Sequence, residues 1–351
     1  MERVKLVDVA RAAGVHPGTA SRALAPDSSG LVSPETVRRV VRAAERLGYV
    51  PNTLARGLRM ARSFMIGMVV PDITNPLFPP MVRGAEQVLS IAGYTLVLTD
   101  TDNDAASERR QVDQLRARGT DGFLLATARW NDELLDELAD AGVPAVLINR
   151  NTAGHRLPYV GADDRTGVSA AVSHLADLGH RRIVHLAGPQ DTSTGRERAS
   201  AFRQAIRGHG LPAGRGLVRP CAAYSEDAGA EATERLLASG AEFTAILAGN
   251  DLIALGALRV LAAAGLRCPH DVSVVGFNDL PLVDKLTPSL TTVTLPLREM
   301  GALSAQMLLT ALDAPRVAGP VAQALLGVEL AVRGSTGRCR GAVPGNPHKR
   351  A

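Results

Sequence analysis

Aromatic side chains are scarce in this chain: Phe, Trp and Tyr make up 3% of its 351 residues, although 46% are hydrophobic. Its core must therefore consist mainly of Ala, Val and Leu. The three cysteines lie far apart, without CxxC or Cys/His spacing, which argues against a disulfide framework and a structural zinc site. No uncharged apolar run reaches the roughly 18 residues of a membrane span. The N-terminus has charges where a signal peptide would be apolar. We therefore expect a cytoplasmic protein without metal or other cofactor.

The modest net charge of +4 conceals an uneven distribution along the chain. Residues 1–63 carry a net charge of +6, residues 64–334 carry −6 and residues 335–351 carry +4. A basic head on an acidic body indicates that the head meets a polyanion and the body does not. The alternative is that the head merely has a solvated basic surface. Only three of the 39 basic residues are Lys, so the abundance of Arg is a property of the whole chain and is by itself weak evidence for DNA binding.

The basic head has the pattern of a helix-turn-helix. Residues 6–13 carry apolar side chains at helical spacing, and Gly14 ends that predicted helix. A second short helix begins at His16-Pro17, because a proline in the first turn loses no hydrogen bond. Two short helices around a glycine turn need a third to form a core. We predict it between the Ser33 cap and Gly48. A three-helix packing module that binds no DNA is the alternative.

The second helix of a helix-turn-helix lies in the DNA major groove, with its N-terminal residues at the base edges. Arg22 has the forked donor that a guanine edge accepts, and the hydroxyls of Thr19 and Ser21 suit phosphate oxygens. His16 and Pro17 lie at the N-terminal end of the same helix. We therefore predict that these five residues contact DNA.

The head resembles the lactose/galactose repressor (LacI/GalR) family of bacterial transcription regulators. The matching motifs are VDVARAAGVHPGTASRAL, VSPETVRRVVRAAERLGYVPN and ARGLR. The resemblance implies a hinge helix over residues 52–60, capped by Asn52, that enters the minor groove. It makes Leu58 a wedge between base steps, with Arg56 and Arg59 beside phosphates. It also implies a homodimer on a pseudo-palindromic operator of double-stranded DNA.

From residue 64 onward, short apolar runs alternate with helical patterns, which predicts an α/β body with parallel sheets covered on both faces. The predicted strands are 64–70, 95–99, 122–126, 145–149, 182–187, 244–248 and 272–277. The predicted helices lie around 81–92, 105–118, 131–141, 165–178, 197–208, 226–239, 251–264 and 297–311.

Polar residues follow the predicted strands, as in PDITNP, TDTDND, INR, GADD, GND and FND. Ligands of such sheets bind beyond the carboxyl ends of the strands. Amides, carboxylates and guanidinium groups together suit a polyhydroxylated small molecule. The alternative is that each Asp or Asn caps the following helix. The repetition at so many strand ends favours a ligand cleft.

The resemblance to the family continues through the body, in PDITNPLF, LADLGHRRIVHLAGP, GNDLIALGALRVLAAAGLRCPHDVSVVGFNDLP, PSLTTV and ELAVRGST. It implies two similar subdomains like those of periplasmic sugar-binding proteins, with three crossovers near residues 160, 290 and 320. The effector contacts that it implies by motif position are Asn75, Phe78, Asn149, Asp163, Thr194, Arg198, Tyr224, Asn250 and Asn278. Among them, Arg198 would be a forked donor, and Tyr224 and Phe78 would stack on an apolar ring face.

Two departures from the family pattern affect these expectations. Lys5 stands where relatives often carry a capping Thr, which predicts a weaker cap for the first helix. Asn278 stands where relatives often carry Asp, which replaces a charged acceptor with an amide.

We therefore predict a three-helix helix-turn-helix head over residues 1–49 and a hinge helix with linker over 50–63. The effector-binding and dimerisation body spans 64–334. Its N-terminal subdomain covers about 64–160 and 291–320, and its C-terminal subdomain about 161–290 and 321–334. Residues 335–351 are predicted to be a disordered tail, rich in Gly and Pro.

The expected function is a cytoplasmic homodimeric transcriptional repressor whose operator affinity is controlled by a small, sugar-like effector. No GxSxG, Walker A, HExxH or GxGxxG motif occurs, so we expect no enzyme. A periplasmic binding protein is the rival interpretation of the body, and the fused head opposes it. Whether the effector induces or co-represses stays open.

Overall fold

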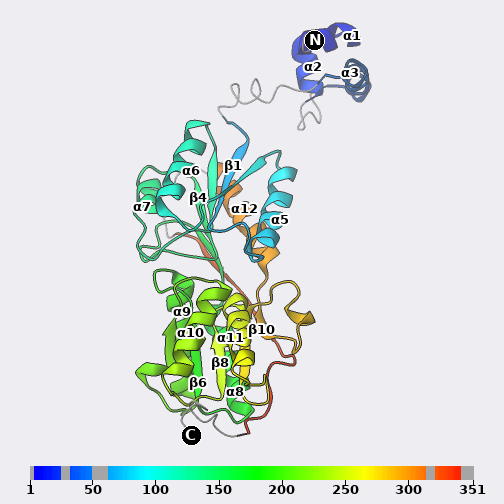
Figure 1. The fold of residues 1–351 in the computed structure, drawn as a ribbon. Coiled ribbons are helices and arrows are strands. Elements are labelled where there is room, and N and C mark those ends of the chain that lie inside the picture. Colours follow the sequence, from blue (N-terminus) through cyan, green and yellow to red (C-terminus); the bar gives the residue numbers. More distant parts are fainter. Residues whose placement is uncertain (1–3, 25–31, 50–61, 314–320, 341–351) are drawn as a thin grey trace. The chain divides into compact units, whose positions relative to one another are not determined.

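The structure, a computed structural model, describes residues 4–24, 32–49, 62–313 and 321–340. The chain divides into two compact units, Met1–Ser63 and Phe64–Ala351, which we call the head and the body. Figure 1 shows the helices of the head, and the sheets of the body with the helices that cover them. Among the described helices, none is long and apolar enough to cross a membrane.

In its described residues the head consists of α1 (Leu6–Ala13), α2 (Pro17–Ala23) and α3 (Pro34–Leu47). The bounds of α1 and α3 and the start of α2 are as predicted. Its core is built from small side chains, which let short helices approach closely: Val9, Ala10, Ala13, Ala20, Ala23, Val40, Ala43 and Ala44. His16 and Ser33 cap α2 and α3 through side-chain acceptors. Helix α1 lacks such a cap at Lys5. Instead, the Asp8 carboxylate accepts the Lys5 backbone N–H at 3.0 Å.

The body contains two six-stranded sheets with the same strand order. The first runs β11 (Gln323–Leu326), β5 (Tyr159–Ala162), β4 (Ala145–Ile148), β3 (Gly122–Leu125), β1 (Met65–Val70), β2 (Thr95–Asp100). The second runs β12 (Glu329–Ala331), β10 (Thr291–Thr294), β9 (Ser273–Asn278), β8 (Ala245–Ala248), β6 (Ile183–Ala187), β7 (Val218–Pro220). Every pair is parallel except the edge pair β12–β10. The predicted α/β class with parallel sheets is confirmed.

In the described part of the body, eight helices cover these sheets, four in each subdomain. The first subdomain contains α5 (Phe78–Ile91), α6 (Ala105–Ala117), α7 (Glu133–Asp140) and α12 (Leu297–Asp313). The second contains α8 (Asp164–Asp177), α9 (Ser193–Gly208), α10 (Glu226–Ala238) and α11 (Asp251–Ala263). Two 3₁₀ turns, Arg215–Leu217 and Val283–Lys285, lie in connecting segments of the second subdomain.

The chain passes between the subdomains three times. It leaves the first sheet after β5, returns between β10 and α12, and leaves again between β11 and β12. The second and third crossovers therefore fall a few residues later than we predict near 290 and 320. The reason is that β10 still belongs to the second sheet and β11 still belongs to the first. Neither strand was predicted, because both are short and lack a strong apolar pattern.

The prediction of a disordered tail from residue 335 onward is wrong for residues 335–340. Residues 335–340 pack along the second sheet rather than leaving it. Ser335 Oγ donates to the Val274 carbonyl at 2.6 Å and accepts the Thr291 N–H at 2.8 Å. The Cys339 N–H donates to the Leu178 carbonyl at 2.9 Å. Residues 341–351 lie outside the described residues.

Each subdomain contains one close helix crossing built on a pair of glycines. In the first, α5 and α12 lie side by side (Figure 1), and a Cβ on Gly84 or Gly301 would collide with the carbonyl oxygen of Arg298 or Met81. In the second, Gly229 and Gly256 meet backbone in the same way where α10 crosses α11. Glycine is required at these positions because only hydrogen fits between the two backbones.

Gly301→Ala should therefore lower the free energy of unfolding by about 1–3 kcal/mol, because the new methyl forces α5 and α12 apart. Gly208→Ala is the matched control, since nothing lies within 4 Å of a Cβ at that position. It should be neutral or stabilise by about 0.5–1 kcal/mol. Urea unfolding of both variants measures the difference, and equal stabilities would show that the crossing tolerates a side chain.

Candidate functional site

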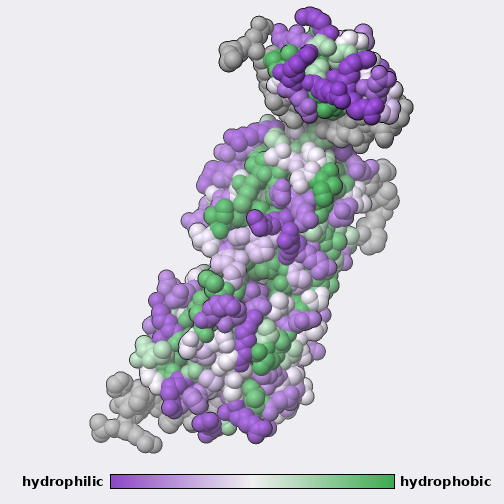
Figure 2. Space-filling model, turned by 90° about the vertical axis from the view of Figure 1, so that its right-hand side faces the viewer, coloured by the Kyte–Doolittle hydropathy of each residue, from purple (hydrophilic) through white to green (hydrophobic). Residues whose placement is uncertain are grey.

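The second helix of the head presents its predicted DNA contacts on its outer side. Ala20 and Ala23 are buried against α1 and α3, which leaves Arg22 exposed. Its Nε donates to the Gly18 carbonyl one turn earlier at 3.1 Å, which holds the guanidinium along the helix. The visible face of the head in Figure 2 is mostly hydrophilic.

The other predicted head contacts have different positions. The exposed His16 uses its Nδ1 to accept the Gly18 N–H at 3.1 Å. Pro17 is the first residue of α2, and Thr19 and Ser21 are half-buried on it. The predicted hinge contacts Asn52, Arg56, Leu58 and Arg59 lie outside the described residues.

The body has a cleft where the strand order of both sheets reverses. In the first sheet the chain turns from β2 across β1 to β3, and in the second from β7 across β6 to β8. Loops diverge at such switch points and leave a crevice at the carboxyl ends of the strands. Two hydrogen bonds join the subdomains beside it. The Trp130 N–H donates to the Asp191 carbonyl at 2.6 Å, and the Asn151 N–H to Ser193 Oγ at 2.8 Å.

Two adjoining cavities occupy this cleft, which we call the outer and inner cavity. The outer cavity measures about 260 Å³ and is lined by residues that follow β1, β2, β3, β4, β6 and β7, and by Glu108 of α6. The inner cavity is only about 20 Å³. Its lining residues are Asn75, Leu77, Phe78, Asn149, Arg150, Thr194, Arg198, Tyr224, Asn250 and Asn278.

Eight of the nine predicted effector contacts line the inner cavity, and three of these, Asn75, Phe78 and Tyr224, also line the outer one. The lining residues come from distant parts of the sequence: Asn75 and Asn278, which line the same cavity, are 203 positions apart. The Tyr224 hydroxyl lies 2.9 Å from Thr194 Oγ1, which orients the ring at the junction of the two cavities.

Asp163 is the exception among the predicted effector contacts, because it lines neither cavity. Its half-buried carboxylate caps α8 by accepting the backbone N–H of Thr166 at 3.0 Å and its hydroxyl at 2.7 Å. These bonds hold the pKa of Asp163 below its usual value. The neighbouring Asp164 is the acid that points inward.

Arg198 and Asp164 form a buried ion pair at the floor of the cleft. Arg198 is 3% exposed and Asp164 5%, and the guanidinium Nη2 lies 2.9 Å from a carboxylate oxygen. Nη1 donates to the Gly249 carbonyl at 2.7 Å, and the guanidinium lies 3.8 Å above the centre of the Phe277 ring. Burial raises the pKa of Asp164, and the positive charge of Arg198 opposes that rise. The pair therefore joins α8, α9 and two strand ends.

Three asparagines that line the cleft, Asn103, Asn149 and Asn278, have a backbone conformation that most side chains avoid, and two of them occupy equivalent positions. Asn149 after β4 has φ 65°, and Asn278 at the end of β9 has φ 121°. Strands β4 and β9 occupy the same position in their respective sheets. Asn tolerates positive φ better than most residues, and strained backbone is concentrated at binding sites. These two positions therefore indicate a site.

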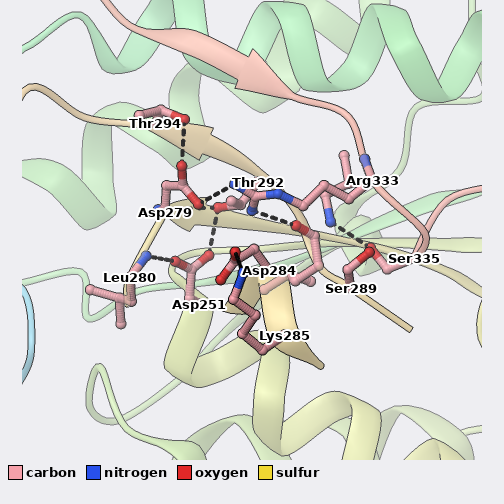
Figure 3. A network of polar contacts seen from close by, with 12 residues as sticks. Asp251, Asp279, Leu280, Asp284, Lys285, Ser289, Thr292, Thr294, Arg333 and Ser335 are labelled. Atoms are coloured by element: carbon pink, nitrogen blue, oxygen red, sulfur yellow. Dashed lines mark hydrogen bonds and ion pairs between the residues drawn. The ribbon is translucent and has the colours of Figure 1, made fainter. Parts of the chain in front are cut away.

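A polar network fixes the strand end that carries Asn278 (Figure 3). Asp251, fully buried at the start of α11, accepts the Thr292 hydroxyl at 2.6 Å and the Leu280 N–H at 2.7 Å. Asp279 accepts the Thr294 hydroxyl at 2.9 Å and pairs with Arg333 at 2.8 Å. Burial raises the pKa of Asp251 to about 6. The network links β9 to the crossover strands beside it.

Sequence reasoning missed two buried charged residues of the outer cavity, Glu108 and Arg150. Glu108 accepts the Thr127 hydroxyl and is 3% exposed. It lies on the buried side of α6 with Val112 and Leu115. The sequence did contain a signal for Glu108, because this acid occupies a position of the helical pattern that is otherwise apolar. Arg150 directly follows the predicted contact Asn149. The sequence did not reveal it as a cavity residue, because the direction of its side chain depends on the conformation of the turn after β4. Among the described residues, no group of three or more His, Cys, Asp or Glu could hold a metal ion.

Known proteins share both parts of this chain. The family described as bacterial regulatory proteins of the lacI family matches residues 5–52. The one described as periplasmic binding proteins and sugar binding domain of LacI family matches residues 63–321. The ribose operon repressor of Halalkalibacterium halodurans is 32% identical, over 87% of this chain and 89% of that protein.

Solved structures agree with these matches. A complex of the transcriptional regulator CelR with cellobiose has a TM-score of 0.72 at 33% identity, and the match covers 95% of this chain and all of that one. A lac repressor dimer bound to operator and the anti-inducer ONPF has a TM-score of 0.80 at 27% identity, over 96% of this chain and all of that one.

Asp164→Ala should lower the free energy of unfolding of the body by about 3–5 kcal/mol, because it leaves a buried guanidinium without its counter-charge. Asp163→Ala is the neighbouring control and should cost about 1 kcal/mol, as expected for the loss of a helix cap. Chemical unfolding followed by circular dichroism separates the two. Equal losses would mean that the ion pair adds nothing beyond capping.

Proposed function

Because the chain belongs to the LacI family of bacterial regulatory proteins, we propose that it is a cytoplasmic transcriptional repressor. It binds a pseudo-palindromic operator as a homodimer, with α2 in the major groove and residues 50–63 as hinge and linker. A sugar-like effector binds in the cleft of the body and changes operator affinity. The cleft residues that contact it are the eight predicted residues that line the two cavities.

One observation carries this proposal: a helix-turn-helix with an exposed arginine and a polar cleft at two sheet switch points lie on the same chain. An effector that touches both subdomains, through residues such as Asn75 and Asn250, favours one of their arrangements over another. Such differential binding is the condition for any effect on a distant DNA site. A periplasmic binding protein would need only the body, so it does not account for the head.

The purified full chain tests the proposal on genomic DNA. Footprinting should recover a site with two-fold symmetry, and sugars are then assayed for their effect on binding to that site. A sugar that releases the operator is an inducer, and one that strengthens binding is a co-repressor. Recovery of no preferred sequence would contradict the proposal.

Tyr224→Ala should remove the effect of the active sugar on operator binding and leave the binding itself intact. The reason is that Tyr224 lines both cavities and, among the residues that the structure describes, its side chain hydrogen-bonds only Thr194. A mobility-shift titration with and without the sugar measures both properties. A normal sugar response in this variant would place the effector elsewhere.

Arg22→Ala should weaken binding to the recovered operator by about 1–3 kcal/mol and relax specificity at one base pair. Arg46→Ala on α3, which removes an exposed arginine of the same head, is the control for charge. Fluorescence anisotropy with operator and random DNA compares them. An equal loss on both DNAs would show that Arg22 contacts only the phosphate backbone.

A further inference from the structure

Two buried groups of opposite charge face the outer cavity without a hydrogen bond between them. Glu108 comes from α6, and Arg150 follows β4 and is 8% exposed. Each acts on the other only through its charge. Buried charges in proteins are normally paired or fully hydrogen-bonded. Among the described residues, Glu108 and Arg150 therefore both lack the partner that a buried charged group normally has.

Arg198 in the same cleft differs from Arg150 in that both of its Nη atoms have partners, whereas the buried Nε of each arginine has none in the described part of the body. It has a carboxylate, a carbonyl and an aromatic face as neighbours. Arg150 has no side-chain hydrogen bond or ion pair within the described part of the chain, and its buried Nε has no acceptor. The closest aromatic ring, that of Tyr224, is 5.8 Å away. Its donors are thus available to a ligand in the outer cavity.

Glu108 likewise has one carboxylate oxygen, Oε2, available to a ligand in the outer cavity. Thr127 Oγ1 donates to Oε1. Oε2 accepts no hydrogen bond from the residues that the structure describes. A ligand that meets both groups must donate to Glu108 and accept from Arg150. An anion would be opposed by the ionised carboxylate and a cation by the guanidinium, whereas a hydroxyl satisfies both.

We propose that Glu108 and Arg150 form a hydroxyl-binding subsite in the outer cavity, where the effector donates to Glu108 and accepts from Arg150. This rests on the proposed function, since it assumes that the cleft binds a sugar-like effector. It adds two residues to the eight contacts around the inner cavity. It also assigns the outer cavity, which has most of the volume, to the ligand.

The protonation of Glu108 provides a specific signature for this subsite. Burial, with a smaller contribution from the charge of Asp132, raises the pKa of Glu108 to about 7, although the Thr127 hydroxyl, Arg129 and Arg150 act to lower it. A hydroxyl that donates to the carboxylate favours the ionised form. Effector binding therefore lowers the pKa of Glu108 and releases a proton. Affinity should rise with pH below about 7, by at most about tenfold per pH unit, and level off above it.

The test is isothermal titration of the full chain with ribose, glucose, galactose, cellobiose and maltose between about pH 6 and about pH 8. The sugar that binds most tightly is then titrated into variants. Glu108→Gln should weaken binding by about ten- to a hundredfold at the upper pH and abolish the pH dependence. Asp113→Asn, an exposed acid on the same helix, should match the wild type in both respects.

Operator binding without sugar shows that each variant is folded. Thr127→Val is a second test that keeps the carboxyl group. It removes the hydroxyl that stabilises the ionised form, so the rise in affinity should move to higher pH. Arg150→Gln should weaken binding at every pH while the dependence on Glu108 persists.

The outcomes separate the two proposals. If no sugar of the series binds the wild type, the proposed sugar cleft itself is contradicted. If a sugar binds but its affinity is independent of pH, or Glu108→Gln binds it as the wild type does, the hydroxyl subsite is overturned while the proposed function stands. Weaker binding together with loss of the pH dependence in Glu108→Gln supports the subsite.

Discussion

The ion pair between Arg198 and Asp164 is the interaction on which the cleft depends. Burial of the Arg198 guanidinium at 3% exposure costs several kcal/mol of desolvation free energy. The carboxylate, the Gly249 carbonyl and the Phe277 ring together compensate for that cost. They come from the first crossover and from the ends of β8 and β9. The side chains above them, such as Asn250 and Asn278, therefore lie on a fixed floor.

The two subdomains repeat one architecture, and the repetition explains the position of the site. Both sheets have the same strand order, both contain a glycine-lined helix crossing, and both end an equivalent strand in an asparagine with positive φ. Two rigid halves joined by three short crossovers can rearrange as bodies around a ligand held between them. In the proposed repressor, that rearrangement is the link between effector and operator.

The sequence predicted most of the fold because long apolar strands and capped helices are local signals. The seven predicted strands are present, and the cap at Ser33 forms as expected. The five missed strands have three or four residues each. Three of them, β7, β11 and β12, lie at sheet edges, where an apolar pattern is not required. The site was predicted from the same local signals, because residues directly after long strands line the cleft. The sequence could not show which of the adjacent acids Asp163 and Asp164 points inward.

The sequence by itself determined that a basic three-helix head precedes an α/β body, and which strand ends carry polar groups. These properties depend on the order and spacing of neighbouring residues. Only the tertiary structure decided which acid pairs with Arg198, that residues 335–340 complete the second subdomain, and that Glu108 and Arg150 share a cavity. Those outcomes depend on the direction of single side chains and on contacts across more than forty residues, from Glu108 to Arg150. A local pattern contains no information about them, because burial and charge compensation are properties of the packed molecule.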